Sequence, residues 1–160
     1  MEQEISMNSA NPRPAVLQPG DGRTFNLLGQ TITVKLSSGE TGGAYYLFEN
    51  TVPPGARVPA HLHRFEDEIL EVLEGELEVL LDRNTFKAPA GTIGFFPKQI
   101  VHGFSNPGST PAKGRFLVTP GANFEKFFGE LSALPADQPP DMPRIAEIFA
   151  RYGVPIVSAA

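Results

Sequence analysis

Hydrophobic and polar residues alternate in short segments along most of the chain. Between residues 17 and 120, β-branched and aromatic residues gather in runs that Gly, Pro, Asn and Ser separate. This pattern predicts strands joined by turns. The predicted strands span residues 23–28, 31–36, 44–52, 67–81, 92–96, 101–106 and 115–119, with a turn at Gly75 inside the longest. Many short strands at even spacing favour an antiparallel sandwich or barrel.

The last part of the chain shows the periodicity of helices. One apolar stripe follows Asn123, an acceptable N-cap, and consists of Phe124, Phe127, Phe128 and Leu131. A second predicted helix has Asp141 as its cap, Pro143 in its first turn and Gly153 at its end. Its stripe consists of Ile145, Ile148, Phe149 and Tyr152. We expect both helices to pack on the outside or the end of the barrel; the alternative is that they form a lid or a dimer contact.

The length of 160 residues fits one domain with a sizeable core. We expect residues 1–16 to form a flexible N-terminal arm, because they are polar and lack a hydrophobic pattern. Residues 17–120 would form the β-barrel, and residues 121–160 a C-terminal helical extension on it. The edge strands of such a barrel and the arm make a homodimer the expected assembly.

Composition excludes several classes of function. The formal net charge is −5, from 13 basic and 18 acidic residues, and the basic residues are scattered, so no nucleic-acid partner is expected. There is no cysteine, hence no disulfide framework and no thiolate metal site. The N-terminal region does not resemble a signal peptide, and no apolar run is long enough to cross a membrane. A cytoplasmic location is the expectation.

The only three histidines fall where one metal site would need them. His61 and His63 are two residues apart, which would place both on one face of an extended strand, and His102 would come from another strand. Glu68 follows closely and shares its strand face with apolar residues, which favours it over the neighbouring carboxylates Glu66 and Asp67. Three imidazoles and one carboxylate suit a single divalent Mn, Fe, Co, Ni, Cu or Zn ion.

Glycine, proline and asparagine recur at fixed offsets around these ligands. The first group is Gly55, His61, His63, Glu68 and Gly75, and the second is Gly91, Pro97, His102 and Asn106. These groups resemble the two sequence motifs of the cupin superfamily, whose barrels are double-stranded β-helices, or jelly rolls. One position departs from the pattern, because Gln99 stands where the second motif has glycine. The resemblance implies an all-β cupin jelly-roll barrel with two short C-terminal helices.

Aromatic residues predict an apolar cavity near the metal. With 12 Phe, three Tyr and no Trp, the interior is mostly apolar, and Phe104 should face the same way as His102. Further candidates for the pocket wall, for each of which a place in the barrel core is the alternative, are Phe65, Phe95, Phe96, Phe116, Tyr45 and Tyr46. Such a wall suits a small apolar or aromatic substrate.

The stretch 41–49, the segment ending at Gly75 and the C-terminal tail resemble bacterial single-domain cupins similar to quercetin 2,3-dioxygenases. The resemblance implies a metal-dependent dioxygenase that acts on a flavonol or a similar enolic aromatic substrate with dioxygen. Glu68 would then be the catalytic base as well as a ligand. The alternatives are a metal-dependent isomerase, lyase or hydrolase acting on a small oxygenated metabolite, and a small-molecule-binding cupin without catalysis.

Overall fold

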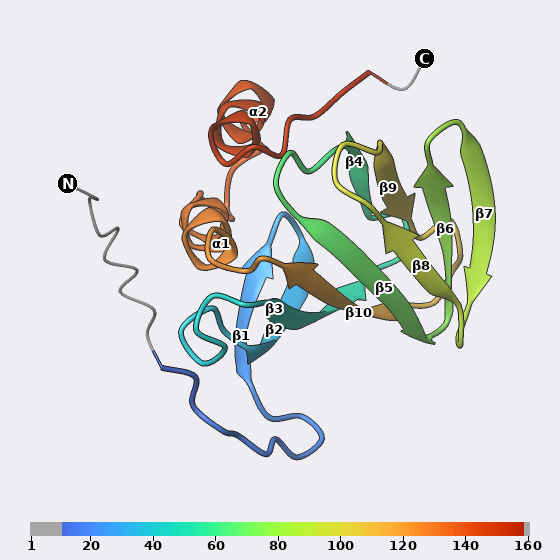
Figure 1. Ribbon diagram of the computed structural model, residues 1–160. Coiled ribbons are helices and arrows are strands. Elements are labelled where there is room, and N and C mark those ends of the chain that lie inside the picture. The colour runs from blue at the N-terminus through green and yellow to red at the C-terminus, as the bar shows by residue number, and fades with distance from the viewer. Residues whose placement is uncertain (1–10, 159–160) are drawn as a thin grey trace.

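The computed structural model describes residues 11–158 of the chain, which fold into two antiparallel sheets followed by two short helices (Figure 1). The strands are β1 (Arg23–Leu27), β2 (Gln30–Leu36), β3 (Tyr46–Val52), β4 (Arg57–His61), β5 (Asp67–Glu74), β6 (Glu76–Leu81), β7 (Asn84–Pro89), β8 (Ile93–Phe96), β9 (His102–Ser105) and β10 (Ala112–Thr119). The helices are α1 (Phe124–Ser132) and α2 (Met142–Arg151).

The two sheets enclose one apolar core. One sheet has the strand order β1-β2-β3-β10-β5-β8 and the other has the order β4-β9-β6-β7. Alternate residues of β3 and β10 point inward, so that Phe48 and Phe116 stack with ring centroids 5.1 Å apart. Phe104 from the other sheet lies 5.3 Å from Phe116 and joins the two layers. The predicted all-β jelly-roll barrel with two short C-terminal helices is confirmed.

Each predicted strand is present, one of them is divided at Gly75, and the structure has two further strands that hydrophobic alternation did not predict. The predicted strand 67–81 is a pair of strands, β5 and β6, that meet at the predicted turn of Gly75. The strand β4 is absent from the strands predicted by hydrophobic alternation, although the histidine spacing placed His61 on an extended strand. It contains Pro59, which interrupts a regular ladder, and there the pairing with β9 shifts in register, as in a bulge. The strand β7 was not predicted because it has only one buried residue, Ala88, and so lacks alternation.

The two helices bury the predicted apolar stripes. In α1 the buried residues are Phe124, Phe127, Phe128 and Leu131, and in α2 they are Ile145, Ile148 and Phe149. The predicted cap of α2 is confirmed, because the Asp141 side chain accepts a hydrogen bond from the backbone N–H of Arg144. Asn123 is the N-cap residue of α1, as predicted, but it has helical backbone angles and its side chain makes no cap bond; the helix is tied to the preceding turn through its backbone.

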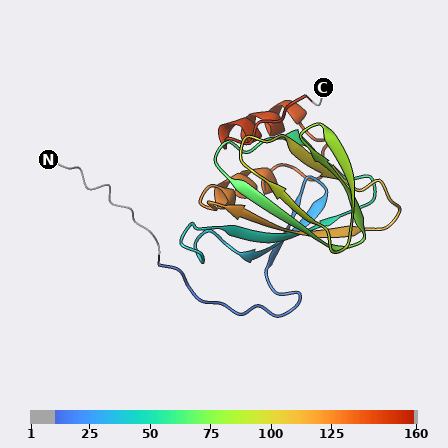
Figure 2. The ribbon, with the colours of Figure 1, turned by 45° about the vertical axis from the view of Figure 1, so that its right-hand side comes forward.

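Both helices lie side by side next to the barrel (Figures 1 and 2). The ring of Phe128 packs edge-on against Phe48 of β3 at 5.0 Å, and Phe127 contacts Phe149 of α2 at 5.0 Å. Of the predicted arm, residues 1–10 lie outside the described residues, and the backbone N–H of Arg13 donates to the carbonyl of Glu40. Neither helix within residues 11–158 has the length and apolar character needed to span a bilayer.

Polar and glycine residues of the two motifs shape the turns. Asn106, which is fully buried, donates to the carbonyls of Val52 and Thr110 and accepts from the backbone N–H of Gly108, so it holds the turn after β9. Gly75 and Gly91 both have positive φ, at 71° and 95°. A side chain at Gly75 would approach the carbonyl oxygen of Pro111 to 2.9 Å, whereas Gly91 has open space beside it. A side chain would therefore be obstructed at Gly75 but not at Gly91.

This difference makes a matched pair of substitutions informative. We expect Gly91→Ala to lower the free energy of unfolding by about 1–2 kcal/mol, the strain of a left-handed alanine. Gly75→Ala carries the same strain and a backbone clash, so its loss should be larger by about 1–3 kcal/mol. Urea denaturation of the two variants measures this difference. Equal losses would show that crowding at Gly75 does not matter.

Candidate metal centre and cavity

Three buried imidazoles meet at one end of the barrel. His61 ends β4, His102 begins β9, and the two residues are paired in register across the sheet. His63 lies two residues beyond the end of β4. The nitrogen atoms that His61, His63 and His102 can offer all lie within 4.8 Å of one another, and each of these residues is at most 5% exposed. The structure therefore brings together the three histidines that the sequence singled out.

Backbone carbonyls orient two of the imidazole rings. His61 Nδ1 lies 2.8 Å from the carbonyl oxygen of Pro59, and His102 Nδ1 lies 3.0 Å from that of Ile100. A carbonyl only accepts hydrogen bonds, so both Nδ1 atoms carry the proton and both Nε2 atoms have a free lone pair. Within the described residues, Nε2 of His102 is buried without a hydrogen-bond partner.

Two buried carboxylates complete the cluster. Glu68 of β5 places Oε2 at 3.3 Å from Nε2 of His63 and Oε1 at 3.8 Å from Nε2 of His102. On the other side of the His63 ring, Oε2 of Glu66 lies 3.7 Å from Nδ1. Glu66 is only 1% exposed. The sequence analysis treated Glu66 as a rival ligand and did not predict its place beside Nδ1 of His63, although its even spacing from Glu68 was the signal.

His63 is not on the same strand as His61, so that prediction is wrong. The chain leaves β4 after His61, and the segment that carries His63 is held from two sides by hydrogen bonds. On one side, the backbone N–H of Arg64 donates to the carbonyl of Gly153 at 2.8 Å, in the segment after α2. On the other, Gln99 donates from its backbone to His63 at 2.8 Å and from its side chain to Arg64 at 3.1 Å.

Gln99 occupies the position where the second motif has glycine. Its φ is +71°, in the left-handed region that favours glycine. A glutamine in this conformation is strained, and its side-chain bond to the carbonyl of Arg64 is the compensating contact that a glycine could not make. The departure from the motif thus leaves the turn intact and adds one contact to the segment of His63.

Burial and charge set the protonation of the three rings differently. Burial holds the pKa of His61 well below its ordinary value, and the neighbouring His102 and His63 add to this effect. Burial also lowers the pKa of His102, against the opposing attraction of Glu68. For His63 burial acts in the same direction, but the carboxylates of Glu66 and Glu68 outweigh it and raise its pKa.

These features fit a divalent transition metal. Neutral imidazoles with free Nε2 atoms, as in His61 and His102, are the form in which histidine binds such ions. Within the described part of the chain, a bound cation would also give a partner to the buried Nε2 of His102, and it would offset the negative charges of Glu66 and Glu68. His61, His63 and His102 could therefore hold a metal ion, with Glu68 in reach as a fourth ligand.

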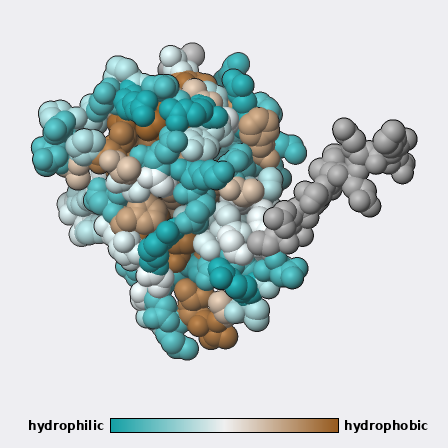
Figure 3. All heavy atoms as spheres, turned by 90° about the vertical axis from the view of Figure 1, so that its left-hand side faces the viewer, coloured by the Kyte–Doolittle hydropathy of each residue, from teal (hydrophilic) through white to brown (hydrophobic). Residues whose placement is uncertain are grey.

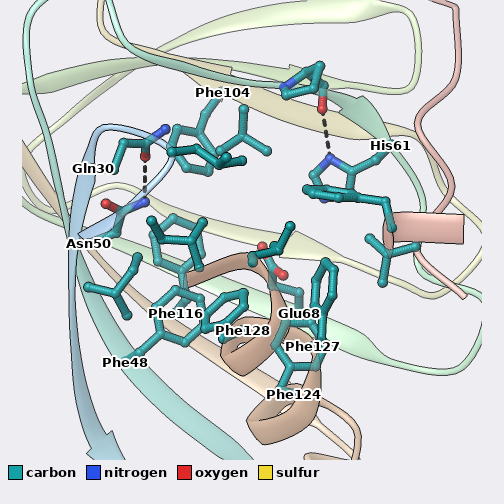
Figure 4. Close-up of a pocket in the computed structure, with 18 of the residues that line it drawn as sticks. Gln30, Phe48, Asn50, His61, Glu68, Phe104, Phe116, Phe124, Phe127 and Phe128 are labelled. Carbon is teal, nitrogen blue, oxygen red and sulfur yellow. Dashed lines mark hydrogen bonds between the residues drawn. The ribbon is translucent and has the colours of Figure 1, made fainter. Parts of the chain in front are cut away.

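The cluster opens into an apolar cavity of about 80 Å³ (Figure 4). Phenylalanine is the most frequent residue in its wall, with side chains from β3, β9, β10, α1 and α2. The phenylalanines that line it are Phe48, Phe104, Phe116, Phe124, Phe127, Phe128 and Phe149. Phe124 of α1 stacks on His63 with ring centroids 5.6 Å apart, so the helical extension closes the cavity directly over the metal centre.

Two of the predicted wall residues, Phe104 and Phe116, line the cavity. Phe65, Phe95 and Tyr45 do not, because they are exposed by 58%, 54% and 37%. Strand alternation turns Phe95 outward beside Ile69, and Phe65 covers Gly153 at the surface. Two further predicted residues are buried but lie outside the cavity lining: Phe96, which stacks on His102 at 4.5 Å, and Tyr46, which packs against Phe48 and Phe128.

A larger groove of about 700 Å³ adjoins the cavity. It runs between the turn joining β1 to β2 and the segment joining α1 to α2, and it shares Leu28 and Leu131 with the cavity wall. Leu28 has φ +52° in a two-residue turn where Asn or Gly is usual. Figure 3 shows this side of the molecule, on which apolar side chains alternate with hydrophilic ones. The groove is the candidate entrance to the cavity.

The fold and the histidine cluster agree with a comparison against known protein families. Residues 48–119 match the family described as "Cupin domain", which covers most of the barrel and both predicted motifs as far as His102 and Asn106. Together with the jelly-roll fold, this match supports membership of the cupin superfamily.

Matches to individual proteins have limited identity and cover only part of this chain. The chain is 36% identical over 101 residues to "Polyketide synthase CurC" of Streptomyces cyaneus, a match that covers 63% of this chain and 60% of the relative. The polyketide cyclase RemF of Streptomyces resistomycificus has a TM-score of 0.58 and 21% identity over 67% of this chain and 80% of its own. A predicted oxalate decarboxylase of Thermotoga maritima has a TM-score of 0.59 and 22% identity over 66% and 98%. These two structural likenesses show the fold alone.

The negative charge of Glu66 beside the His63 ring leads us to predict an effect on metal affinity. Glu66→Gln keeps the size of the side chain but removes the negative charge beside Nδ1 of His63. Mutation of a residue that contacts a metal ligand on the side away from the metal typically lowers metal affinity by about 10–100-fold, so we expect a loss of at least about tenfold. Competition with a chelator of known affinity measures it. Glu76→Gln, at an exposed site, is the control, and an unchanged affinity in Glu66→Gln would contradict the role.

Proposed function

We propose that the protein is a metal-dependent enzyme that acts on a small, enolic aromatic substrate. The observation that carries this proposal is the opening of the His61, His63 and His102 cluster into a cavity walled by phenylalanine. Three protein ligands, or four with Glu68, leave positions free for substrate on an ion that prefers six. A bound divalent ion would supply Lewis acidity, which lowers the pKa of a substrate hydroxyl.

The side chains of the chain itself would do three things. The Glu68 carboxylate, at 3.3 Å from Nε2 of His63, would accept the proton of the substrate hydroxyl. The phenylalanines of α1 would hold a planar ring and exclude water from the reacting group. The carbonyls of Pro59 and Ile100 would keep His61 and His102 in the tautomer that ligates, so that proton transfer is left to Glu68.

More specifically, the proposed reaction is that of a dioxygenase acting on a flavonol or a similar substrate. Deprotonation makes such a ring electron-rich, and an apolar cavity admits dioxygen and a planar ring more readily than charged metabolites. The cavity of about 80 Å³ is small compared with the ~300–1,000 Å³ of many ligand sites. A three-ring flavonol would therefore extend past Leu28 and Leu131 into the adjoining groove.

The second candidate is a reaction without oxygen, such as isomerisation or ring closure of an enolisable substrate. The similarity to the polyketide synthase CurC favours it, although the chain spans only 60% of that relative. Both candidates share the metal, the base and the aromatic cavity. They differ in whether dioxygen is consumed.

Oxygen uptake separates the two candidates. The metal-loaded protein is incubated with quercetin or with a polyketide-like enolic substrate, and dioxygen and product are measured together. The dioxygenase predicts one dioxygen consumed for each substrate converted, and no product under anaerobic conditions. Turnover that proceeds equally without oxygen would overturn the dioxygenase and support the second candidate. Absence of metal-dependent turnover of any enolic aromatic substrate would overturn the proposal as a whole.

Glu68→Gln tests the base in the same assay. The variant keeps the three histidines, so we expect it to retain bound metal, while turnover falls by at least about 100-fold, as for the loss of a general base. Glu78→Gln, exposed on β6, is the matched control and should keep full activity. Full turnover in Glu68→Gln would show that the proton goes elsewhere.

A further inference from the structure

A pair of buried amides lies in the barrel away from the metal centre. Gln30, at the start of β2, is 3% exposed, and Asn50, on β3, is 4% exposed. Nδ2 of Asn50 donates to Oε1 of Gln30 at 2.7 Å. Nε2 of Gln30 in turn donates to the carbonyl oxygen of Arg57 at 3.3 Å. Neither amide belongs to the histidine cluster or to the proposed proton transfer.

The carbonyl of Arg57 determines how both amides are oriented. Because this carbonyl only accepts, the nitrogen of Gln30 must face it, and the oxygen of Gln30 faces Asn50. The nitrogen of Asn50 therefore faces Gln30, and its Oδ1 is left over. Within the described residues, Oδ1 of Asn50 is buried without a hydrogen-bond partner. A buried acceptor without a partner is unfavourable and calls for an explanation.

The pair has both kinds of hydrogen-bonding capacity to spare. Each amide nitrogen carries two N–H groups, and among the described residues each donates only one bond. The hydrogen-bonding groups that remain unused are thus one acceptor, Oδ1 of Asn50, and one N–H donor on each amide nitrogen. A hydroxyl group can both donate and accept, so it matches this set better than an ether or a carbonyl, which only accept.

The two amides are placed where their unused hydrogen-bonding groups could contact a substrate. Gln30 and Asn50 both line the apolar cavity. Figure 4 shows them on one side of it and His61 on the other, with Phe104, Phe116 and Phe128 drawn between. Apart from this pair, the polar residues in the cavity lining are Arg57 and the metal-centre residues His61, His63 and Glu68. The cavity therefore has a polar group at each side and an aromatic wall between.

We propose that Gln30 and Asn50 form a specificity subsite that binds a second hydroxyl of the substrate, distant from the hydroxyl at the metal centre. This inference rests on the proposed function and narrows its substrate class to aromatic compounds with oxygen substituents at both ends. The hydroxyl donates to Asn50 Oδ1 and accepts from a spare amide N–H. Two anchoring points would fix the orientation of a flat ring that the phenylalanine wall alone leaves free to turn.

Two probes of nearly equal shape test the subsite in the metal-loaded, full-length protein. Both 2,3-dihydroxynaphthalene and 2,3,6-trihydroxynaphthalene carry the same pair of hydroxyls for the metal, and only the second has a hydroxyl at the far end. Calorimetry gives the dissociation constant of each. We expect the trihydroxy probe to bind about tenfold more tightly, which corresponds to one net hydrogen bond.

Substitution of the pair separates recognition from structure. Asn50→Leu, similar in size, should abolish the preference for the trihydroxy probe and leave binding of the dihydroxy probe nearly unchanged. If this variant does not fold, the double variant Asn50→Leu/Gln30→Met takes its place, because it removes both amides and so leaves neither of them buried without its partner. Ile32→Val, which also lines the cavity, is the control and should weaken both probes equally while keeping the preference.

The outcomes distinguish the subsite from the proposed function. Equal binding of the two probes by the unsubstituted protein, or a preference that survives in Asn50→Leu, would overturn the subsite while leaving the metal-dependent function in place. If neither probe binds in a metal-dependent manner, the proposed function fails, and the subsite with it. Loss of the preference in Asn50→Leu with an unchanged melting temperature would show that the pair serves ligand recognition rather than stability.

Discussion

Burial of ionisable groups in an apolar interior is the constraint on which the site depends. His61, His63, His102, Glu66 and Glu68 are all buried in the barrel. Burial of an imidazole or a carboxylate is unfavourable unless each polar atom finds a partner. Backbone carbonyls provide partners for two Nδ1 atoms, and the carboxylates lie beside His63. The inward-facing Nε2 atoms are what a metal ion would satisfy, so the same arrangement explains both the order of the site and its chemistry.

The aromatic residues around the centre serve the same constraint. Each imidazole has an aromatic neighbour from a different element: Phe96 of β8 stacks on His102, Phe124 of α1 stacks on His63, and Phe149 of α2 lies edge-on to His61. Two of these three rings come from the C-terminal helices. The segment after α2 also bonds to the backbone that carries His63. The helices are therefore part of the site, and they form one wall of its cavity.

Much of this site could be predicted from the sequence, because spacing along strands determines direction. The alternation within β5 predicted that Glu68 points inward, and the motif spacing predicted that His102 lies close to His61; the structure has both. Residue spacing does not predict side-chain direction where the backbone is irregular. Pro59 interrupts the alternation of β4, and His63 lies beyond the end of that strand, in a segment that hydrogen bonds to Gln99 and Gly153 hold in place. The cavity wall was predicted least well, because Phe124, Phe127 and Phe128 reach it only through the packing of α1 on the barrel, which no local pattern specifies.

The central claim is that the three histidines bind a divalent metal, and metal content tests it most directly. Elemental analysis of the freshly purified protein, compared with His102→Ala, measures the ion without depending on any substrate. The account predicts about one divalent transition-metal ion per chain, and its loss from the variant, because removal of one of three imidazoles takes away a ligand that the others cannot replace. A protein that stays free of metal even after incubation with Mn, Fe, Co, Ni, Cu and Zn ions, or an equal metal content in His102→Ala, would contradict it.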